Sequence, residues 1–235
     1  PVSQTYYIDR GVTIDEVDLP TAIANLKYLT KSMLFKDPIA DFANYLGFLL
    51  TPMVQTALKV KMVPFHTFRK NQRGTGATTA VNVLGYIYDD RAVESCNLNA
   101  KTSDEELRKT LTSGLADEFS KLNFDDSSGT LDRVPFVKYL TSGSWTDRQL
   151  GTNKMLTFLN PGMMLMDTRN NGWIGGDMAR RCSLIEFHTE LEHPELRPTD
   201  PPNLPAYIKQ NRGLLLGALA ALIKNWSEVP GNDKI

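Results

Sequence analysis

The first third of the chain carries apolar residues at helical spacing. Within Thr21–Lys31 they recur every three or four positions, which predicts a helix because such residues share one face of a helical turn. The same spacing predicts a second helix over Ile39–Thr51. Pro52 suits either a first helical turn or a break in a helix. We therefore expect residues 1–56 to form a helical, collar-like segment.

From about residue 58, short apolar runs alternate with amphipathic segments. The runs predict strands at Val60–Phe65, Ala92–Leu98, Leu122–Phe124, Gly162–Met166 and Cys182–Phe187. The segments between them predict helices at Ala80–Tyr88, from the capping box Ser103-Asp-Glu-Glu106 to about Ser120, and at Thr130–Leu140. Alternating strands and helices with apolar strands predict an α/β fold whose parallel sheet is covered by helices on both faces.

Two further patterns complete the predicted architecture. Trp145–Asn160 reads as a hairpin because glycine and asparagine in Gly151-Thr-Asn153 separate two β-like runs, and Lys154 falls at or near its tip. After a proline-rich linker, Leu204–Trp226 has leucines on one helical face. We expect a helical segment over 1–56, an α/β core over 57–200 and a C-terminal helical segment over 201–235.

Composition suits a soluble globular protein, with 41% hydrophobic and 23% charged residues. No apolar run approaches the roughly 20 residues that a membrane helix needs. The start, Pro-Val-Ser-Gln-Thr, lacks both a signal-peptide pattern and an initiating Met, so we expect a fragment of a longer protein. A net charge of −1 argues against a broad face for duplex DNA, although it allows lysines that converge on a channel.

The cysteines and histidines give no sign of a metal site. Cys96 and Cys182 lie far apart in apolar runs, which favours buried free thiols over a disulfide. The three histidines have no Cys or His partner at the spacing of metal ligands, so we expect no zinc site.

A glycine-rich turn carries the strongest chemical signal. Residues 71–79 read Asn-Gln-Arg-Gly-Thr-Gly-Ala-Thr-Thr, an almost complete phosphate-binding loop between a predicted strand and a predicted helix. Its glycines would let backbone N–H groups surround phosphates, and Thr78 occupies the position of a Mg²⁺ ligand. Ala77 stands where a lysine would reach the β- and γ-phosphates, and Asn71 replaces the first glycine. Taken alone, the loop is equally compatible with an ordinary Gly/Thr-rich turn.

Polar residues follow the next predicted strands. Asp125-Asp126 comes directly after an apolar run, where carboxylates can hold Mg²⁺ and orient a water molecule, although solvated loop aspartates are the common alternative. Asn170-Asn171 could position water or form an ordinary Asn-Asn-Gly turn. Arg180 and Arg181 directly precede the last predicted strand. They could form surface ion pairs, or they could be cations that stabilise phosphate charge.

Together these segments resemble the AAA+ ATPase module of superfamily 3-like replicative helicases from phages, plasmids and integrated elements. The resemblance extends from about Ala40 to Pro230. It rests on Gly74–Thr79, Thr141–Met155, Asn170-Asn171, Gly176–Arg181 and Glu192–Arg197. Such modules are often fused to a primase or primase-polymerase, and they work as hexameric rings that couple ATP hydrolysis to translocation on single-stranded DNA.

The resemblance implies a role for each matching position. The nucleotide-binding residues would be Gly74, Thr75, Gly76, Ala77, Thr78 and Thr79. The catalytic residues would be Asp125 and Asp126 as the second acidic motif, Asn170 as sensor with Asn171 as alternative, and Arg181 as arginine finger with Arg180 as second candidate. Thr78 and Asp125 would hold Mg²⁺, and Lys154 on the hairpin would grip single-stranded DNA.

The implied ligands are ATP and Mg²⁺. The implied partners are single-stranded DNA, other copies of the chain in a homo-hexamer, and a fused or associated primase or polymerase, in the cytoplasm of the host cell and without a membrane. Ala77 makes hydrolysis by this chain doubtful. We favour an engineered replacement of lysine, because the other motifs are kept. A natural alanine would favour a non-hydrolysing nucleotide-binding scaffold or loader, and a third alternative is an α/β interaction domain without nucleotide.

Overall fold

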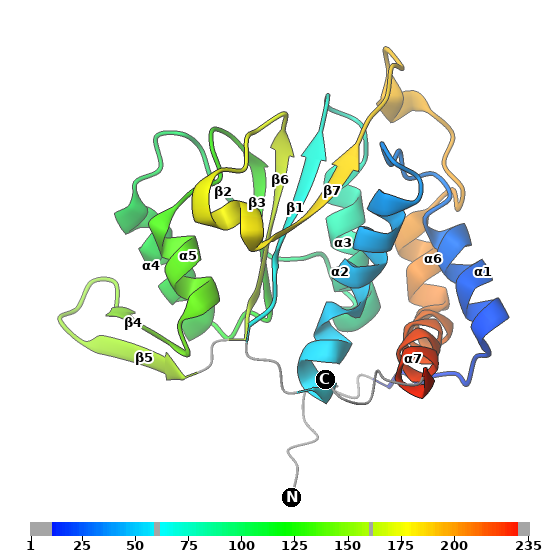
Figure 1. Cartoon of the computed structure of the whole chain (residues 1–235), viewed down its shortest axis with the longest axis horizontal. Helices are drawn as coiled ribbons and strands as arrows, with labels where there is room; N and C mark the ends of the chain where they lie inside the picture. The colour runs from blue at the N-terminus through cyan, green and yellow to red at the C-terminus, as the bar shows by residue number, and fades with distance from the viewer. Residues whose placement is uncertain (1–10, 59–61, 160–161, 230–235) are drawn as a thin grey trace, which may run out of the picture.

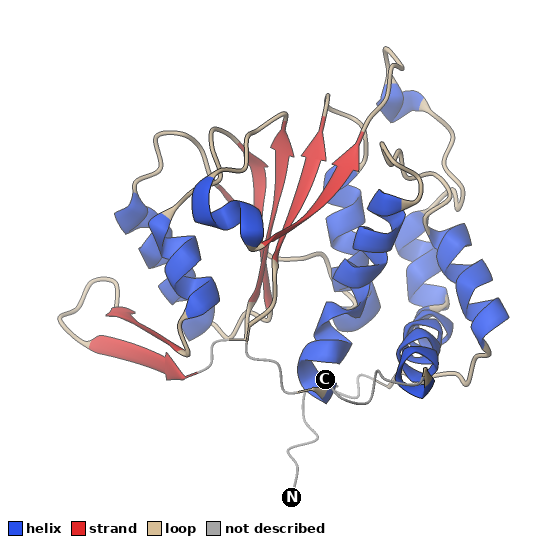
Figure 2. Ribbon diagram, in the orientation of Figure 1, coloured by secondary structure: helices blue, strands red, loops and turns tan. Residues whose placement is uncertain are grey.

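A five-stranded parallel sheet with the strand order β2-β3-β6-β1-β7 forms the centre of the computed structural model (Figures 1 and 2). The structure describes residues 11–58, 62–159 and 162–229. The strands are β1 (Phe65–Lys70), β2 (Ser95–Asn97), β3 (Lys121–Ser127), β6 (Met164–Asn170) and β7 (Cys182–Phe187). Helices flank the sheet, so the predicted α/β fold of the P-loop type is confirmed.

Helices cover the two faces of the sheet as separate layers (Figure 1). On one side lie α4 (Asp104–Ala116) and α5 (Val134–Thr141). On the other side lie α2 (Ala40–Ala57) and α3 (Ala77–Asp89), with an outer group made of α1 (Leu19–Leu29), α6 (Leu204–Gln210) and α7 (Arg212–Glu228). Two short 3₁₀ helices, Gly176–Arg180 and Pro194–Leu196, flank β7 in the sequence.

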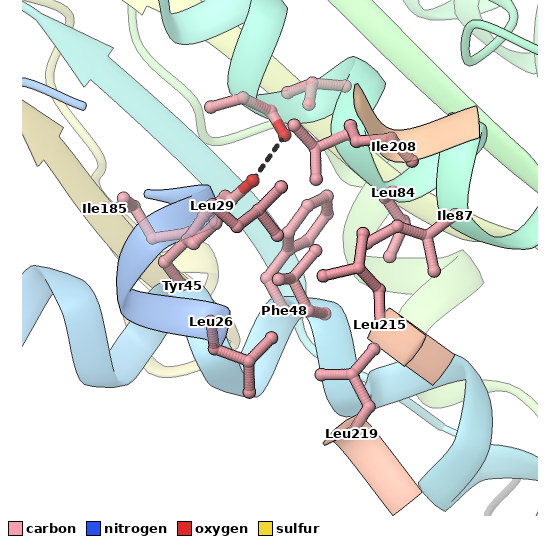
Figure 3. Packing of buried hydrophobic residues seen from close by; sticks show 14 of the residues in the cluster. Leu26, Leu29, Tyr45, Phe48, Leu84, Ile87, Ile185, Ile208, Leu215 and Leu219 are labelled. Carbon is pink, nitrogen blue, oxygen red and sulfur yellow. Dashed lines mark hydrogen bonds between the residues drawn. The ribbon is translucent and has the colours of Figure 1, made fainter. Parts of the chain in front are cut away.

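The outer helices share one apolar core with the sheet. Leu26 of α1 and Leu215 of α7 are buried in the same cluster as Phe48 of α2, and Figure 3 shows these side chains gathered between the helices. The hydroxyl of Tyr45 donates to the carbonyl of Ala80, 2.9 Å away, and so ties α2 to α3. N-terminal and C-terminal helices therefore pack together. The proposed division into segments 1–56, 57–200 and 201–235 stays a prediction.

Three strands, β1, β3 and β6, extend beyond their predicted positions. The predicted strand Val60–Phe65 is wrong, because β1 begins only at Phe65 and continues through Arg69 and Lys70; residues 59–61 lie outside the described part of the chain. Likewise β6 continues past Met166 to Asn170. Apart from Phe68, the residues added to β1 and β6 are polar or charged and most are buried, which an apolar pattern does not predict.

The predicted helix ends also differ from the structure. Pro52 lies inside α2 instead of ending it. Helix α4 ends at Ala116, short of Ser120, and α5 begins at Val134, four residues after the predicted start. The predicted C-terminal helix is two helices that meet at Asn211, whose side-chain amide donates to the carbonyl of Tyr207. The capping oxygen of Ser103 does accept the N–H of Glu106, at 3.1 Å.

The predicted hairpin is confirmed as a separate two-stranded sheet of β4 (Ser144–Arg148) and β5 (Met155–Leu159). Buried Trp145 anchors it to α4, because its indole N–H donates to the hydroxyl of Thr112 at 2.9 Å. Lys154 directly precedes β5 and is exposed.

Both cysteines are free, as expected, although Cys96 and Cys182 are only partly buried. Within residues 11–58, 62–159 and 162–229, no helix combines the length and the apolar character needed to cross a membrane.

Candidate nucleotide-binding site

The glycine-rich turn joins the end of β1 to the start of α3. Gly74 and Gly76 have φ values of +78° and +94°, a left-handed conformation that glycine adopts at no steric cost. A Cβ on Gly74 would also lie 2.8 Å from a carboxylate oxygen of Glu195. Gly76, the N-cap residue of α3, has no side chain to cap the helix, so the N–H groups of the first turn are available to an anion.

An acidic side chain meets the start of α3. The hydroxyl of Thr78 donates to Oδ1 of Asp125 at 3.0 Å, and the hydroxyl of Thr168 on β6 donates to the same oxygen. A hydroxyl and a carboxylate are the hard oxygen ligands that Mg²⁺ prefers, and phosphate oxygens and water usually complete its shell. These two residues therefore fit a Mg²⁺ site. The two aspartates lie within β3, at an irregularity in its pairing with β6, and not in a loop beyond the strand.

Asp126 forms an ion pair with a lysine that the sequence analysis missed. The ammonium of Lys70, the last residue of β1, lies 2.8 Å from Oδ1 of Asp126. The Lys70 side chain is only 8% exposed, whereas that of Asp126 is 54% exposed. The hydrogen bond from Lys70, with its charge and that of Arg73, holds the pKa of Asp126 below its usual range. A basic residue directly before the glycine-rich loop was the available sequence signal.

A cavity of about 570 Å³ opens beside the loop, a volume within the range of small-molecule sites. The loop and the start of α3 form one wall. Apolar residues at the end of α1 and around α6 form another: Leu29, Met33, Pro201, Pro202 and Leu204. The cavity can therefore accept a molecule with a phosphate chain at one end and an apolar ring at the other.

Arg197 closes one side of this cavity and was not assigned a role from the sequence. Its guanidinium donates to the carbonyls of Gly74 at 2.9 Å and Thr75 at 3.2 Å. It also donates to the carbonyls of Pro194 and Ser32. Burial lowers the pKa of Arg197 from its usual value. Because its donors are shared among backbone carbonyls, Arg197 fixes the shape of the loop.

The predicted sensor lies at the end of the sheet where β1 leads into the glycine-rich loop. Asn170 ends β6 and is level with Lys70 in the register of β1 and β6. The N–H of Asn171 donates to the carbonyl of Lys70 at 3.0 Å. Both asparagines thus lie next to the loop and the aspartates, and the choice of Asn170 as sensor stays a prediction.

The arginine pair lies at the opposite end of the sheet, where β1 and β7 begin. Arg181 precedes Cys182, which begins β7 and pairs with Phe65 at the start of β1. Six residues of strand span roughly 20 Å, so Arg181 is far from the loop of its own chain. Arg180 and Arg181 both donate to Asp177, whose pKa these bonds lower. Lys154 is also remote from the glycine-rich loop, because the hairpin that carries it lies beside α4 (Figure 1).

Comparisons with known proteins show the fold. No family model matches the chain, and no curated protein matches its sequence. A solved structure of the apo A form of the NrS-1 C-terminal region has a TM-score of 0.56 at 15% identity, over 89% of this chain and 47% of that one. A second structure of this region has a TM-score of 0.52 at 14% identity, over 89% and 46% of the two chains. A structure of JCV helicase has a TM-score of 0.42 at 16% identity, over 88% and 55%. The chain therefore spans about half the length of the NrS-1 structures.

Proposed function

We propose that this chain is an ATP-dependent DNA helicase motor of superfamily 3 type, which serves replication of a phage or mobile element. The proposal is carried by one arrangement: the glycine-rich loop and Thr78 line a cavity, and Thr78 donates to Asp125. This cavity lies at the carboxyl edge of a parallel sheet, where ligands of open α/β folds bind. The sequence resemblance and the fold shared with the NrS-1 C-terminal region support the proposal.

Each part of the site has a task in this proposal. Backbone N–H groups from Gly74 to Thr78 bind the phosphates, and Thr78 with Asp125 holds Mg²⁺. When bound, Mg²⁺ neutralises charge on the phosphate oxygens. Asp126, which Lys70 keeps ionised, and Asn170 orient the attacking water.

Completion of the site requires a neighbouring copy of the chain. Arg181 is too far from its own phosphate loop, so it acts on the nucleotide of the next subunit. A ring of six copies, with Lys154 facing single-stranded DNA in the central channel and a primase or polymerase fused or associated, satisfies this requirement. Because Ala77 removes a cation from the phosphates, the proposed motor is slow or inactive in this form.

A non-hydrolysing scaffold or loader in a replication complex is the second candidate. One observation favours it: position 77 holds alanine while the loop keeps the geometry of a phosphate site. Such a protein would bind ATP and assemble without turnover.

Nucleotide affinity tests the proposed site. Thr78→Val should weaken binding of a fluorescent ATP analogue in Mg²⁺ about tenfold, because the variant loses a metal ligand and a hydrogen bond to Asp125. Thr110→Val on α4, which loses only a bond to the carbonyl of Glu106, should bind like the unaltered chain. Absence of nucleotide binding by the unaltered chain would favour the interaction-domain alternative.

DNA binding tests the role of the hairpin. Lys154→Ala should weaken binding of labelled oligothymidine in an anisotropy titration and reduce the salt slope by about 0.7, the contribution of one phosphate contact. The matched control is Lys109→Ala on α4, whose ammonium already pairs with Glu105 and Glu106. Equal affinities and slopes for the two variants would remove Lys154 from the DNA site.

A further inference from the structure

The candidate phosphate site lacks a lysine at position 77, yet the described residues place two other cations on its cavity wall. Ala77 is buried and contributes only a methyl group to the wall. The cations are those of Lys70 and Arg197. A triphosphate needs such charge nearby, because its terminal group is the most strongly charged part of the molecule.

Lys70 has more donors to spare than Arg197, whose one unbonded nitrogen in the described part of the chain, Nε, is buried. Arg197 donates to the backbone carbonyls of four residues. In the described part of the chain, the Lys70 ammonium has a single hydrogen-bond acceptor, Oδ1 of Asp126. An ammonium has three donors, so two remain for oxygens of another molecule. Lys70 is therefore the cation that can turn to a phosphate without loss of an existing contact.

The position of Lys70 indicates which phosphate it would contact. Its acceptor, Asp126, directly follows Asp125, which accepts the hydroxyl of Thr78. The ammonium thus lies near the residues that would hold Mg²⁺. Mg²⁺ held by Thr78 and Asp125 would neutralise charge on the terminal part of a bound triphosphate, so Lys70 is placed to contact the terminal phosphate.

We propose that Lys70 supplies the cation that position 77 lacks, by contacting the terminal phosphate of a bound nucleoside triphosphate. This inference rests on the proposed nucleotide site. Asp126 holds the ammonium in place before the nucleotide arrives. The nearly buried stem of Lys70 restricts its motion, so little rotamer entropy remains to be lost on binding. The loop therefore discriminates triphosphate from diphosphate although it has no lysine of its own.

The test compares the affinities of two fluorescent nucleotides in Mg²⁺. Lys70→Met should weaken binding of the ATP analogue about tenfold or more, and that of the ADP analogue less than about twofold, because only ATP carries the contacted phosphate. Lys70→Arg should retain most of the preference for ATP. Lys109→Met removes an equal charge from the surface of α4 and should change neither affinity. Equal losses for ATP and ADP, or no loss, would overturn the proposal.

A double-mutant cycle gives a second readout. If Lys70 serves in place of a lysine at position 77, Ala77→Lys should restore ATP binding to Lys70→Met, and the loss caused by Lys70→Met should shrink in the Ala77→Lys background. Additive effects would contradict the assignment. Asp126 is 54% exposed, so it remains solvated without its partner, and circular dichroism should show Lys70→Met to be folded.

The outcomes separate this inference from the proposed function. An unaltered chain that binds ATP, with no selective effect of Lys70→Met, would overturn the assignment of Lys70 and leave the nucleotide site standing. An unaltered chain that binds neither nucleotide would overturn both.

Discussion

Ala77→Lys is expected to raise the rate of ATP hydrolysis about a hundredfold or more when single-stranded DNA is present, the magnitude typical of one preorganised donor at a reacting centre. Ala77 lines the cavity at the start of α3, so a longer side chain can extend from this position towards the phosphates. Phosphate release should be measured with and without DNA, at protein concentrations that favour oligomers. An equal rate for the variant and the unaltered chain would favour the non-hydrolysing scaffold or loader.

The same variant tests whether the site is shared between copies of the chain. In the Ala77→Lys background, Arg181→Ala should abolish turnover and leave nucleotide affinity nearly intact, because Arg181 lies at the edge of the sheet opposite the loop of its own chain. Arg91→Ala, which removes an exposed arginine paired with Glu94, is the matched control and should keep the activity. Strong turnover by the Arg181 variant would refute the arginine-finger assignment.

Arg169→Leu is expected to lower the free energy of unfolding by about 3–5 kcal/mol, because it leaves a buried carboxylate without its counter-ion. Asp167 and Arg169 are 0% and 1% exposed within β6, and Arg169 Nε lies 2.7 Å from Asp167 Oδ2. Urea denaturation followed by circular dichroism measures the change. Arg91→Leu, at an exposed ion pair, should cost less than about 1 kcal/mol.

The pH dependence of the Arg169 variant follows from the burial of Asp167. Burial raises the pKa of this carboxyl above its usual range, and the charge of Arg169 opposes the shift. Loss of Arg169 should raise the pKa further. A group with a raised pKa in the folded state stabilises it only while protonated, so the variant should lose stability as the pH rises through that pKa. Arg169→Leu should therefore unfold more readily at pH 8 than at pH 5. A loss independent of pH would argue against a raised pKa of Asp167 in the folded variant.

Local patterns predicted several elements well. The apolar run Cys182–Phe187 matches β7 at both ends, and the hairpin around Gly151 was correctly placed. The glycine-rich turn was also placed between a strand and a helix. In each case the decisive information lies within a few residues: an apolar run bounded by polar residues, or glycines where the backbone has a positive φ.

Other features depended on partners distant in the sequence. A charged residue after an apolar run favours the start of a loop, so the pattern did not predict a role for Lys70. In the structure Lys70 ends β1 and pairs with Asp126 on β3. The pattern predicts a strand end at Asp167 and Arg169 for the same reason, although inside β6 the two buried charges neutralise each other. Arg197 donates to the carbonyls of Gly74 and Thr75 in the glycine-rich loop, although it lies more than 120 residues later in the chain.

By itself, the sequence determined the α/β class, the glycine-rich loop and the candidate chemistry of Thr78 and Asp125, because these follow from short-range periodicity and backbone requirements. Only the tertiary structure decided which charged residues are buried and which face the cavity. A buried charge is tolerated where an opposite charge or a carbonyl is brought to it by the fold, and no local pattern contains that partner. For this reason Lys70 emerged as a candidate phosphate ligand only once β1 and β3 were placed in one sheet.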